Sequence, residues 1–306
     1  MKATTMLDTI RSLLGAPACA IPLSVCRPAK TYLLEKAGIP PSGTAVLFAI
    51  PYVMTREISD PQRNISLYAV PRDYHGYTKK LEAHLLPSLR AAYPDKRFAL
   101  FADHSPIHEA DAAARAGLGV LGLNRLLITP DHGSLVFLAE IVTDGDYTEV
   151  TGQPIPDFPD QPPRCEGCGA CIKACPGGCL SGETDTCLSA LTQKKGELTD
   201  TEINTVRKGG LAWGCDACQL ACPHNRAVIR EGRDTEIPYF TERRLPYLTQ
   251  ETLAAMSDEA LSERAYAWRG RKVIARNLSF FVESEPTNNR EDREDREDPA
   301  ERSQPS

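Results

Sequence analysis

The sequence predicts a mixed α/β unit followed by a smaller cysteine-rich domain. Apolar runs with the spacing of strands and helices alternate along residues 1–160. Nine of the eleven cysteines lie between Cys165 and Cys222. A hydrophobic fraction of 42% in 306 residues is enough to bury a sizeable core. We therefore expect an α/β domain at 1–160, a cysteine-rich domain at 161–230 and a short helical segment at 231–282.

The elements of the first domain are predicted from periodicity. Leu81, Leu85 and Leu89 recur at helical spacing among charged residues. Residues 45–54 form the longest apolar stretch, which is far too short to span a membrane and indicates a buried strand. A turn signal at 130–133 joins the last two strands. The expected helices span 6–14, 77–92 and 107–116, and the expected strands span 44–53, 97–102, 126–129 and 134–143.

Beyond the first domain, a segment rich in proline and aspartate at 153–163 predicts a linker. Short helices are expected at 250–256 and 258–267, followed by a basic stretch at 269–277. Residues 283–306 carry nine acids and four arginines, which is −5 of the net charge of −6. Such a tail is predicted to be disordered. The net charge therefore says little about nucleic-acid binding by the rest of the chain.

The cysteines of the second domain fall into two runs that each end in Cys-Pro. The first, C-x2-C-x2-C-x3-C-P, is the run of bacterial two-cluster ferredoxins, in which the fourth cysteine binds the other cluster. The second, C-x2-C-x3-C-P, lacks a leading cysteine, which Cys187 could supply. Eight thiolates are enough for two [4Fe–4S] clusters. The expected ligands of one cluster are Cys165, Cys168, Cys171 and Cys222, and those of the other are Cys175, Cys187, Cys215 and Cys218.

Zinc is the alternative, since paired C-x2-C units also form zinc sites. A zinc site does not require four cysteines so closely spaced before a proline. The remaining Cys19, Cys26 and Cys179 are expected to be buried small apolar residues. Clustered cysteines indicate metal binding in a reducing compartment rather than a disulfide scaffold. Since the first ten residues hold no secretory signal, we expect a cytoplasmic protein without a membrane partner.

The glycines at Gly117, Gly119 and Gly122 match G-x-G-x-x-G. A dinucleotide site requires a strand before this motif and a helix after it. Here a helix-like segment precedes the motif and a strand-like segment follows, so we do not expect a dinucleotide site. The glycines still permit close backbone approach to a neighbouring element or a flat cofactor.

Asp103 is the best candidate for a catalytic carboxylate, because it follows a predicted strand and precedes a loop. The alternative is a helix N-cap, since an aspartate before a proline and a helical run often caps a helix. His104, His108 and His132 are expected to be surface or capping residues, because no H-x-x-x-H or H-E-x-x-H pattern supports a histidine metal site.

Five segments resemble the epoxyqueuosine reductases, a family of cobalamin-dependent iron–sulfur enzymes of tRNA queuosine modification. Residues 103–106, for example, are similar to the family's D-[TS]-[GA]-P, and residues 133–141 are similar to its G-S-x-F-F-L-G-E-I. With the second cysteine run, the resemblance covers about residues 66–277. The five segments are 68–75, 103–106, 115–124, 133–141 and 187–192.

The resemblance implies a nitroreductase-like, corrin-binding α/β core with an inserted, ferredoxin-like domain for two [4Fe–4S] clusters. It implies base-off cobalamin, Asp103 as proton donor, reduced flavodoxin or ferredoxin as electron donor, tRNA as partner and a monomer. The chain resembles a short form without the family's C-terminal helical-repeat domain. The implied cofactor contacts are Ser66, Tyr68, Arg72, Tyr74, Gly117, Gly119, Gly122, Asn124 and Ser189.

Several residues depart from the family pattern, and we expect some of them to line the substrate pocket or the corrin rim. They are Pro71, Val120, Leu123, Arg125 and His224. The expected function is the reduction of epoxyqueuosine to queuosine in tRNA. Two alternatives stay open: a corrinoid iron–sulfur reductase of a small molecule, and a dicluster ferredoxin-type electron carrier.

Overall fold

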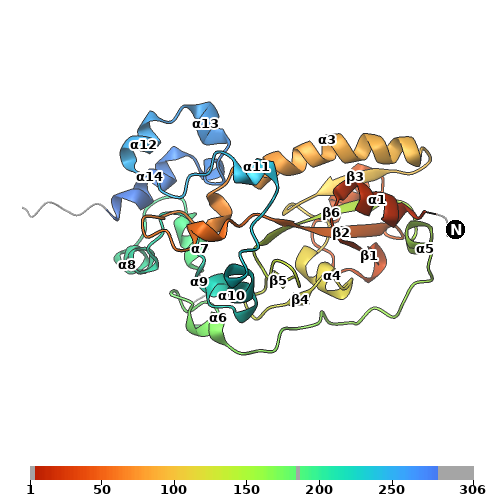
Figure 1. Ribbon diagram of the computed structural model, residues 1–306, viewed down its shortest axis with the longest axis horizontal. Helices are drawn as coiled ribbons and strands as arrows, with labels where there is room; N and C mark the ends of the chain where they lie inside the picture. The colour runs from red at the N-terminus through yellow and green to blue at the C-terminus, as the bar shows by residue number, and fades with distance from the viewer. Residues whose placement is uncertain (1–3, 184–186, 282–306) are drawn as a thin grey trace, which may run out of the picture.

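A four-stranded antiparallel sheet forms the centre of the first domain (Figure 1). The computed structural model describes residues 4–183 and 187–281, so the predicted tail at 283–306 lies outside the described residues. The strands stand in the order β1-β2-β6-β3. Their bounds are β1 (Ala18–Pro22), β2 (Thr44–Pro51), β6 (Val136–Thr143) and β3 (Phe98–Phe101).

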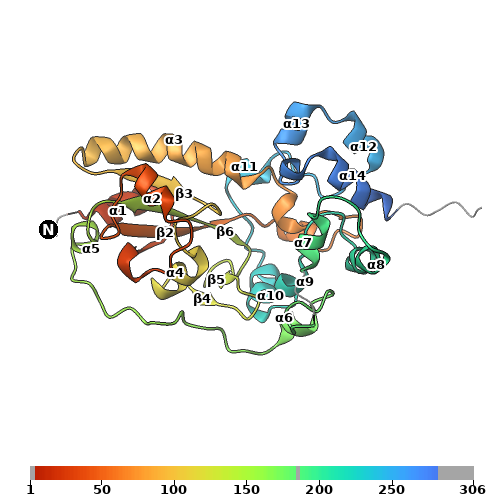
Figure 2. The same cartoon turned by 180° about the vertical axis from the view of Figure 1, so that it is seen from behind.

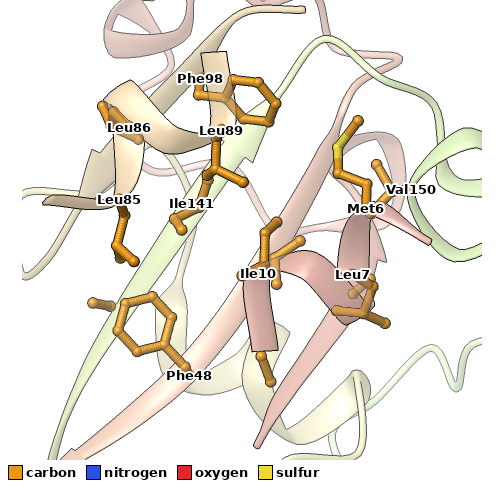
Figure 3. Packing of buried hydrophobic residues seen from close by; sticks show 14 of the residues in the cluster. Met6, Leu7, Ile10, Phe48, Leu85, Leu86, Leu89, Phe98, Ile141 and Val150 are labelled. Atoms are coloured by element: carbon orange, nitrogen blue, oxygen red, sulfur yellow. The ribbon is translucent and has the colours of Figure 1, made fainter. Parts of the chain in front are cut away.

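Both faces of this sheet are buried, which explains why β2 reads as a continuous apolar run. Side chains alternate across a strand, so Val46 and Phe48 face one core while Leu47 faces the other. Figure 3 shows Phe48 and Ile141 beneath the leucines of the long helix on the first face. The first face is covered by α1 (Met6–Leu14) and α3 (Tyr74–Ala92), and the second by α2 (Tyr32–Ala37) and α4 (Glu109–Arg115).

The starts of α1 and α3 follow capping signals. The expected helix at 6–14 is confirmed, because Thr5 and Asp8 form a capping box at its first turn. The helix expected from residue 77 begins earlier, at Tyr74. Its N-cap is Asp73, whose carboxylate accepts a hydrogen bond of 3.1 Å from the backbone N–H of His75.

The two strands expected on either side of the 130–133 turn both form, but they do not pair with each other. β5 (Leu127–Ile128) pairs with β4 (Val120–Leu121) in a separate two-stranded sheet. A Cβ atom on Gly119 would lie 2.3 Å from the carbonyl oxygen of Ile128. Only glycine allows this close approach, so the G-x-G-x-x-G segment serves strand packing here. The helix-then-strand order that argued against a dinucleotide site is confirmed.

A linker connects the sheet domain to the cysteine-rich domain. After α5 (Tyr147–Thr151), residues 152–163 run along the outside of the molecule, as Figure 2 shows in green. Two backbone hydrogen bonds of Leu121 hold the start of the cysteine-rich domain. The N–H of Leu121 donates to the Pro163 carbonyl, and the Leu121 carbonyl accepts from the N–H of Cys165. The helices that follow are α6 (Ala170–Lys173), α7 (Leu188–Thr192), α8 (Asp200–Gly209), α9 (Ala217–Leu220) and α10 (Pro223–Arg230).

The C-terminal helices pack on a core around Trp213 and Tyr266, both of which are fully buried. The helix expected at 258–267 ends early, at Ser262, and a 3-10 turn follows. Within residues 4–183 and 187–281, no helix is long and apolar enough to cross a membrane. The helices are α11 (Pro238–Thr241), α12 (Gln250–Ala255), α13 (Asp258–Ser262) and α14 (Arg271–Ser279), and the 3-10 turns are η1 (Leu23–Val25), η2 (Thr55–Glu57), η3 (Leu67–Ala69) and η4 (Ala267–Arg269).

Buried polar groups join the second cysteine run to the sheet domain. Asn225 is fully buried, and its side chain accepts from the N–H of Ser134 (2.7 Å) and donates to the Ser134 hydroxyl (2.8 Å). Gln219 donates to the Ser134 carbonyl (2.6 Å). On the other side of the run, Arg63 pairs with buried Asp216 at 2.6 Å. Buried polar groups are costly when unpaired, so these bonds hold the two domains in one arrangement.

We expect Leu89→Ala to lower the free energy of unfolding by about 2–5 kcal/mol, because it removes a fully buried side chain between α3 and the sheet. Urea denaturation followed by circular dichroism measures the change. Glu82→Ala, at an exposed position of the same helix, is the control. A loss for Leu89→Ala no larger than that of the control would show that α3 does not pack on this core.

Candidate functional site

The first predicted set of cysteines comes together around one cavity. Its walls include all four expected ligands, contributed by the first run and by the last cysteine of the second run. The imidazole of His224 and the carboxylate of Glu166 meet at 2.8 Å and tie the two runs together beside this cavity. The four cysteines are Cys165, Cys168, Cys171 and Cys222.

The second predicted set borders a separate cavity of about 400 Å³. Cys175, the fourth cysteine of the first run, lies in this second set, as the ferredoxin pattern requires. The expectation that Cys179 is a buried apolar residue is wrong, because it borders the same cavity and its sulfur lies 3.6 Å from that of Cys175. The expected ligands in this cavity are Cys175, Cys187, Cys215 and Cys218.

The donor sets fit iron–sulfur clusters. The first cavity offers four thiols and the second offers five, and each includes cysteines of both runs. Four thiolates are the ligand set of a [4Fe–4S] cluster. Burial raises the pKa of Cys215 to about 11 and that of Cys218 to about 12. Because a thiol binds metal as its thiolate, cluster assembly must displace these protons.

One loop touches every part of the site. Gly122 and Asn124 border the first cysteine cavity, and Asn124 also borders the second. Arg125 borders the second cysteine cavity and a further cavity that contains Asp103. Arg125 has a left-handed backbone, with φ 66°, which turns the chain sharply between the two. Two neighbouring residues of this loop, Asn124 and Arg125, therefore connect the cysteine cavities with the Asp103 cavity.

The Asp103 cavity has a volume of about 210 Å³ and a largely apolar wall. Tyr74 lines it and stacks on Phe137, with ring centroids 4.2 Å apart. Asp103 has a left-handed backbone, with φ 63°, and its side chain is 74% exposed. The helix that follows is capped at His108, so the N-cap alternative for Asp103 is wrong.

Two further carboxyl groups lie behind Asp103. Glu109 lines the cavity, and its carboxylate accepts a 3.0 Å hydrogen bond from the backbone N–H of Asp103. Glu140 on β6 is fully buried and accepts a 2.5 Å hydrogen bond from the Ser105 hydroxyl. Burial raises the pKa of Glu109 to about 7, and burial and then the charge of Glu109 raise the pKa of Glu140. The pair therefore keeps a proton near neutral pH.

Three of the predicted cofactor contacts gather beside the second cysteine set. Ser66 is fully buried, and its hydroxyl has no hydrogen-bond partner in the described part of the chain. A Cβ atom on Gly214 would lie 2.0 Å from that hydroxyl, so only glycine fits before Cys215. Tyr68 lies within hydrogen-bonding reach of Ser189. A buried hydroxyl without a partner is unusual in a folded protein, so the Ser66 hydroxyl is a candidate contact for a polar ligand.

Other predicted contacts lie elsewhere. Arg72 stacks on the Tyr239 ring at 4.1 Å and donates to Glu242. Gly119 packs against β5, as described above, and Gly117 borders a cavity on the side of α1. Among the described residues, these three do not line the Asp103 cavity or the cysteine cavities.

The departures from the family pattern are placed as follows. Arg125 lines the Asp103 cavity. Leu123 and His224 border the first cysteine cavity instead. Val120 lies in the short strand β4, and Pro71 is buried.

Sequence reasoning missed Glu109 and Cys179 as parts of the site. Glu109 stands in the first turn of a helix, where acids are common for reasons of helix stability alone. Its contact with the Asp103 loop and Glu140 joins separate elements, and no local pattern signals such a contact. Cys179 could have been noticed, because it follows a Cys-Pro-Gly-Gly turn that returns the chain toward Cys175.

The fold and the two cavities define a mixed α/β protein with a domain for two iron–sulfur clusters. Residues 164–225 match the family described as a 4Fe-4S double cluster binding domain. An epoxyqueuosine reductase of Listeria monocytogenes is 36% identical over 215 residues, which is 67% of this chain and 53% of that protein. The resemblance to the epoxyqueuosine reductases is thus confirmed in sequence, although the chain spans about half the length of the curated relatives it matches.

Solved structures extend the resemblance to the fold. A crystal structure of epoxyqueuosine reductase with an epoxyqueuosine-modified tRNA-Tyr stem loop is 26% identical, with a TM-score of 0.64, and the match covers 90% of this chain and 79% of that one. An epoxyqueuosine reductase of Bacillus subtilis, whose aspartate-bearing catalytic loop is swung out of the active site, matches with the same identity, coverage and TM-score. The mixed α/β fold with its double-cluster domain is therefore that of these relatives.

We expect Cys168→Ala to reduce the iron content of anaerobically reconstituted protein from about eight to about four per chain, because one of two [4Fe–4S] clusters loses a ligand. Iron and sulfide analysis measures the change, and Cys19→Ala, outside both cysteine cavities, is the control. Zinc in place of iron and sulfide in the unaltered protein would contradict the cluster assignment.

Glu109→Gln is expected to flatten the pH dependence of stability. The folded protein keeps a proton that the unfolded chain releases above its ordinary pKa of 4.5, so the free energy of unfolding falls as pH rises from about 4.5 to 7. This contribution amounts to about 1–3 kcal/mol. Urea denaturation across this range measures it, with Glu82→Gln as the exposed control. Equal slopes for the unaltered protein and Glu109→Gln would show that Glu109 does not titrate in this way.

Proposed function

We propose that this chain reduces the epoxide of epoxyqueuosine to queuosine in tRNA. The two cysteine sets would hold two [4Fe–4S] clusters that supply electrons, base-off cobalamin would supply a reducible cobalt, and Asp103 would donate the proton. The observation that carries the proposal is the loop at 122–125, because it borders both cysteine cavities and the Asp103 cavity. The names of the relatives support the substrate, and the relative solved with a modified stem loop supports tRNA as the partner.

Residues at the Asp103 cavity, together with residues beside the second cysteine set, suit a corrin. The stacked pair of Tyr74 and Phe137 gives a flat apolar wall, and the unpaired hydroxyl of Ser66 offers a contact for an amide-rimmed ring. Ser66, Tyr68, Tyr74, Asn124 and Ser189 would hold the cofactor. When bound, cobalamin supplies a cobalt centre that can be reduced and that reacts with a strained epoxide.

Asp103 would deliver a proton to the oxygen that is released as the epoxide opens. Its loop is held through the backbone N–H that donates to Glu109, while its side chain points out where a ligand can cover it. A carboxyl group serves as an acid near neutral pH when burial disfavours its charged form. Bound substrate would provide that burial. The catalytic aspartate loop of the Bacillus subtilis relative, which is swung out of the active site in that structure, supports a loop here that closes over substrate.

In this proposal the clusters would receive electrons from an external donor. Cys168 at the first cavity and Cys187 at the second are both exposed, so both clusters would lie near the surface. A one-electron donor such as reduced flavodoxin or ferredoxin could dock there, with the chain acting as a monomer. Electrons would then move inward past the loop at 122–125, because this loop borders both cysteine cavities and the Asp103 cavity.

The basic stretch at 269–277 contributes less to tRNA binding than its charge indicates. Arg271 donates to the Met256 carbonyl (2.7 Å) and to Asp258, and Arg276 donates to the Lys194 carbonyl (2.8 Å). These arginines fasten α14 to its neighbours. Arg269 differs, because it stacks at 3.7 Å on Trp268, which is 61% exposed. This pair would provide a surface on which an RNA base can stack.

One observation favours a second candidate, a corrinoid reductase of a small molecule. Arg125 lines the Asp103 cavity, where the family pattern has a small hydroxyl residue, and its cation would suit an anionic substrate. An electron carrier is less well supported, because a carrier has no use for the Asp103 cavity and its buried glutamate pair.

Asp103→Asn is expected to lower turnover of an epoxyqueuosine-containing stem loop by about 10²–10⁴-fold, the usual contribution of a positioned acid. Asparagine keeps the shape of the side chain but carries no acidic proton. Single-turnover assays with anaerobically reconstituted protein measure the effect, and EPR of added cob(II)alamin checks that the corrin still binds. Asp95→Asn, at an exposed position, is the control.

Unchanged turnover in Asp103→Asn with bound corrin would rule out Asp103 as the proton donor. An unaltered protein that carries both clusters but does not alter the cob(II)alamin signal would leave the electron carrier as the better account. Binding of cob(II)alamin without turnover of the stem loop would favour the small-molecule reductase.

A further inference from the structure

Cys179 is a fifth thiol at a site that needs four. It borders the same cavity as the four expected ligands of the second cluster. A [4Fe–4S] cluster takes one protein ligand on each of its four irons. One of the five thiols is therefore left over whenever the cluster is bound.

A tight turn brings Cys179 to Cys175. The backbone N–H of Gly178 donates to the carbonyl of Cys175 at 3.2 Å, and Gly178 has the left-handed φ of 68° that glycine adopts readily. The chain therefore reverses directly after the Cys-Pro step. Because the turn is closed by a backbone hydrogen bond, it places the two sulfurs side by side without help from a cluster.

The separation of these sulfurs decides which role Cys179 can have. The four irons occupy different corners of a cluster, and the thiolate on each iron points away from its own corner, so sulfurs on different irons diverge. Two sulfurs 3.6 Å apart are in van der Waals contact, and they can serve one iron in turn but not two irons at once. We propose that Cys179 is an alternative ligand of the second cluster that shares one iron with Cys175.

Exchange between the two ligands involves no oxidation or reduction. The Cys179 thiol gives up its proton and its sulfur bonds to the iron. The bond between that iron and the Cys175 sulfur breaks, and the Cys175 sulfur takes up a proton. The cluster keeps one thiolate on this iron and the same charge, and the released thiol stays at contact distance.

Single and double substitutions test this proposal in the full chain after anaerobic reconstitution. Cys175→Ala and Cys179→Ala should each keep about eight irons per chain, and the double variant should keep about four, because only the first cluster remains. EPR of the reduced protein should show the second cluster in both single variants. Cys218→Ala is the matched control, since no spare thiol is in contact with it, and it should fall to about four irons alone.

Three results of these substitutions would overturn the proposal. Loss of the second cluster in Cys175→Ala alone would show that Cys179 does not ligate iron. Its loss in Cys179→Ala alone would make Cys179 an obligate ligand and overturn the sharing. Retention in Cys187→Ala would also overturn it, because Cys187 lies near Cys179 as well and would then be the exchanging partner. The signal of the first cluster shows in every variant whether the domain has folded.

Alkylation of the unaltered, cluster-loaded protein gives a test that needs no variant. Iodoacetamide followed by peptide mass spectrometry should modify Cys175 and Cys179 each in part, with about one modification between them. Modification confined to Cys187, Cys215 or Cys218 would identify a different spare thiol and contradict the proposal.

Discussion

The hydrogen bonds of Ser134 with Asn225 and Gln219 set the position of everything else in the site. Ser134 lies two residues before β6 and borders the Asp103 cavity, while Gln219 lies within the second cysteine run and Asn225 directly after it, in α10. A few buried bonds between 2.6 and 2.8 Å therefore fix the cysteine cavities relative to the Asp103 cavity. Since electron transfer depends steeply on distance, a rigid polar joint here would serve the proposed function as well as stability.

The buried carboxyl groups of Glu109 and Glu140 differ from the hydrogen bonds of Ser134, because they do not stabilise the fold. Glu109 and Glu140 contribute little to folding near neutral pH, because burial opposes their ionisation. Both glutamates lie beside the loop of Asp103. The Glu109 carboxylate accepts a hydrogen bond from the backbone N–H of Asp103, and the Glu140 carboxylate accepts one from the hydroxyl of Ser105. A costly group at this place is consistent with a site that handles protons, as perturbed acids commonly mark such sites.

Local rules made much of the fold and the metal site predictable. The cysteine spacing predicted both donor sets, because a few residues of backbone decide which sulfurs can meet. The strand at 44–53 followed from its apolar run, and the helix at 6–14 followed from amphipathic periodicity. The pairing of β4 with β5, the contact of Glu109 with Glu140 and the position of Arg72 on Tyr239 depend on residues distant in sequence. Tertiary packing decides such contacts, and a pattern within one segment does not record them.

The two cysteine runs exchange their last members: Cys175 joins the second set and Cys222 joins the first. Neither metal site is complete until both runs have been synthesised and have docked against each other. A nascent chain of which only the first run has been synthesised therefore holds no complete cluster site. Cluster loading must follow translation of nearly the whole double-cluster domain, and a chain truncated before Cys222 would be deprived of a full ligand set at one site even though most of its cysteines are present.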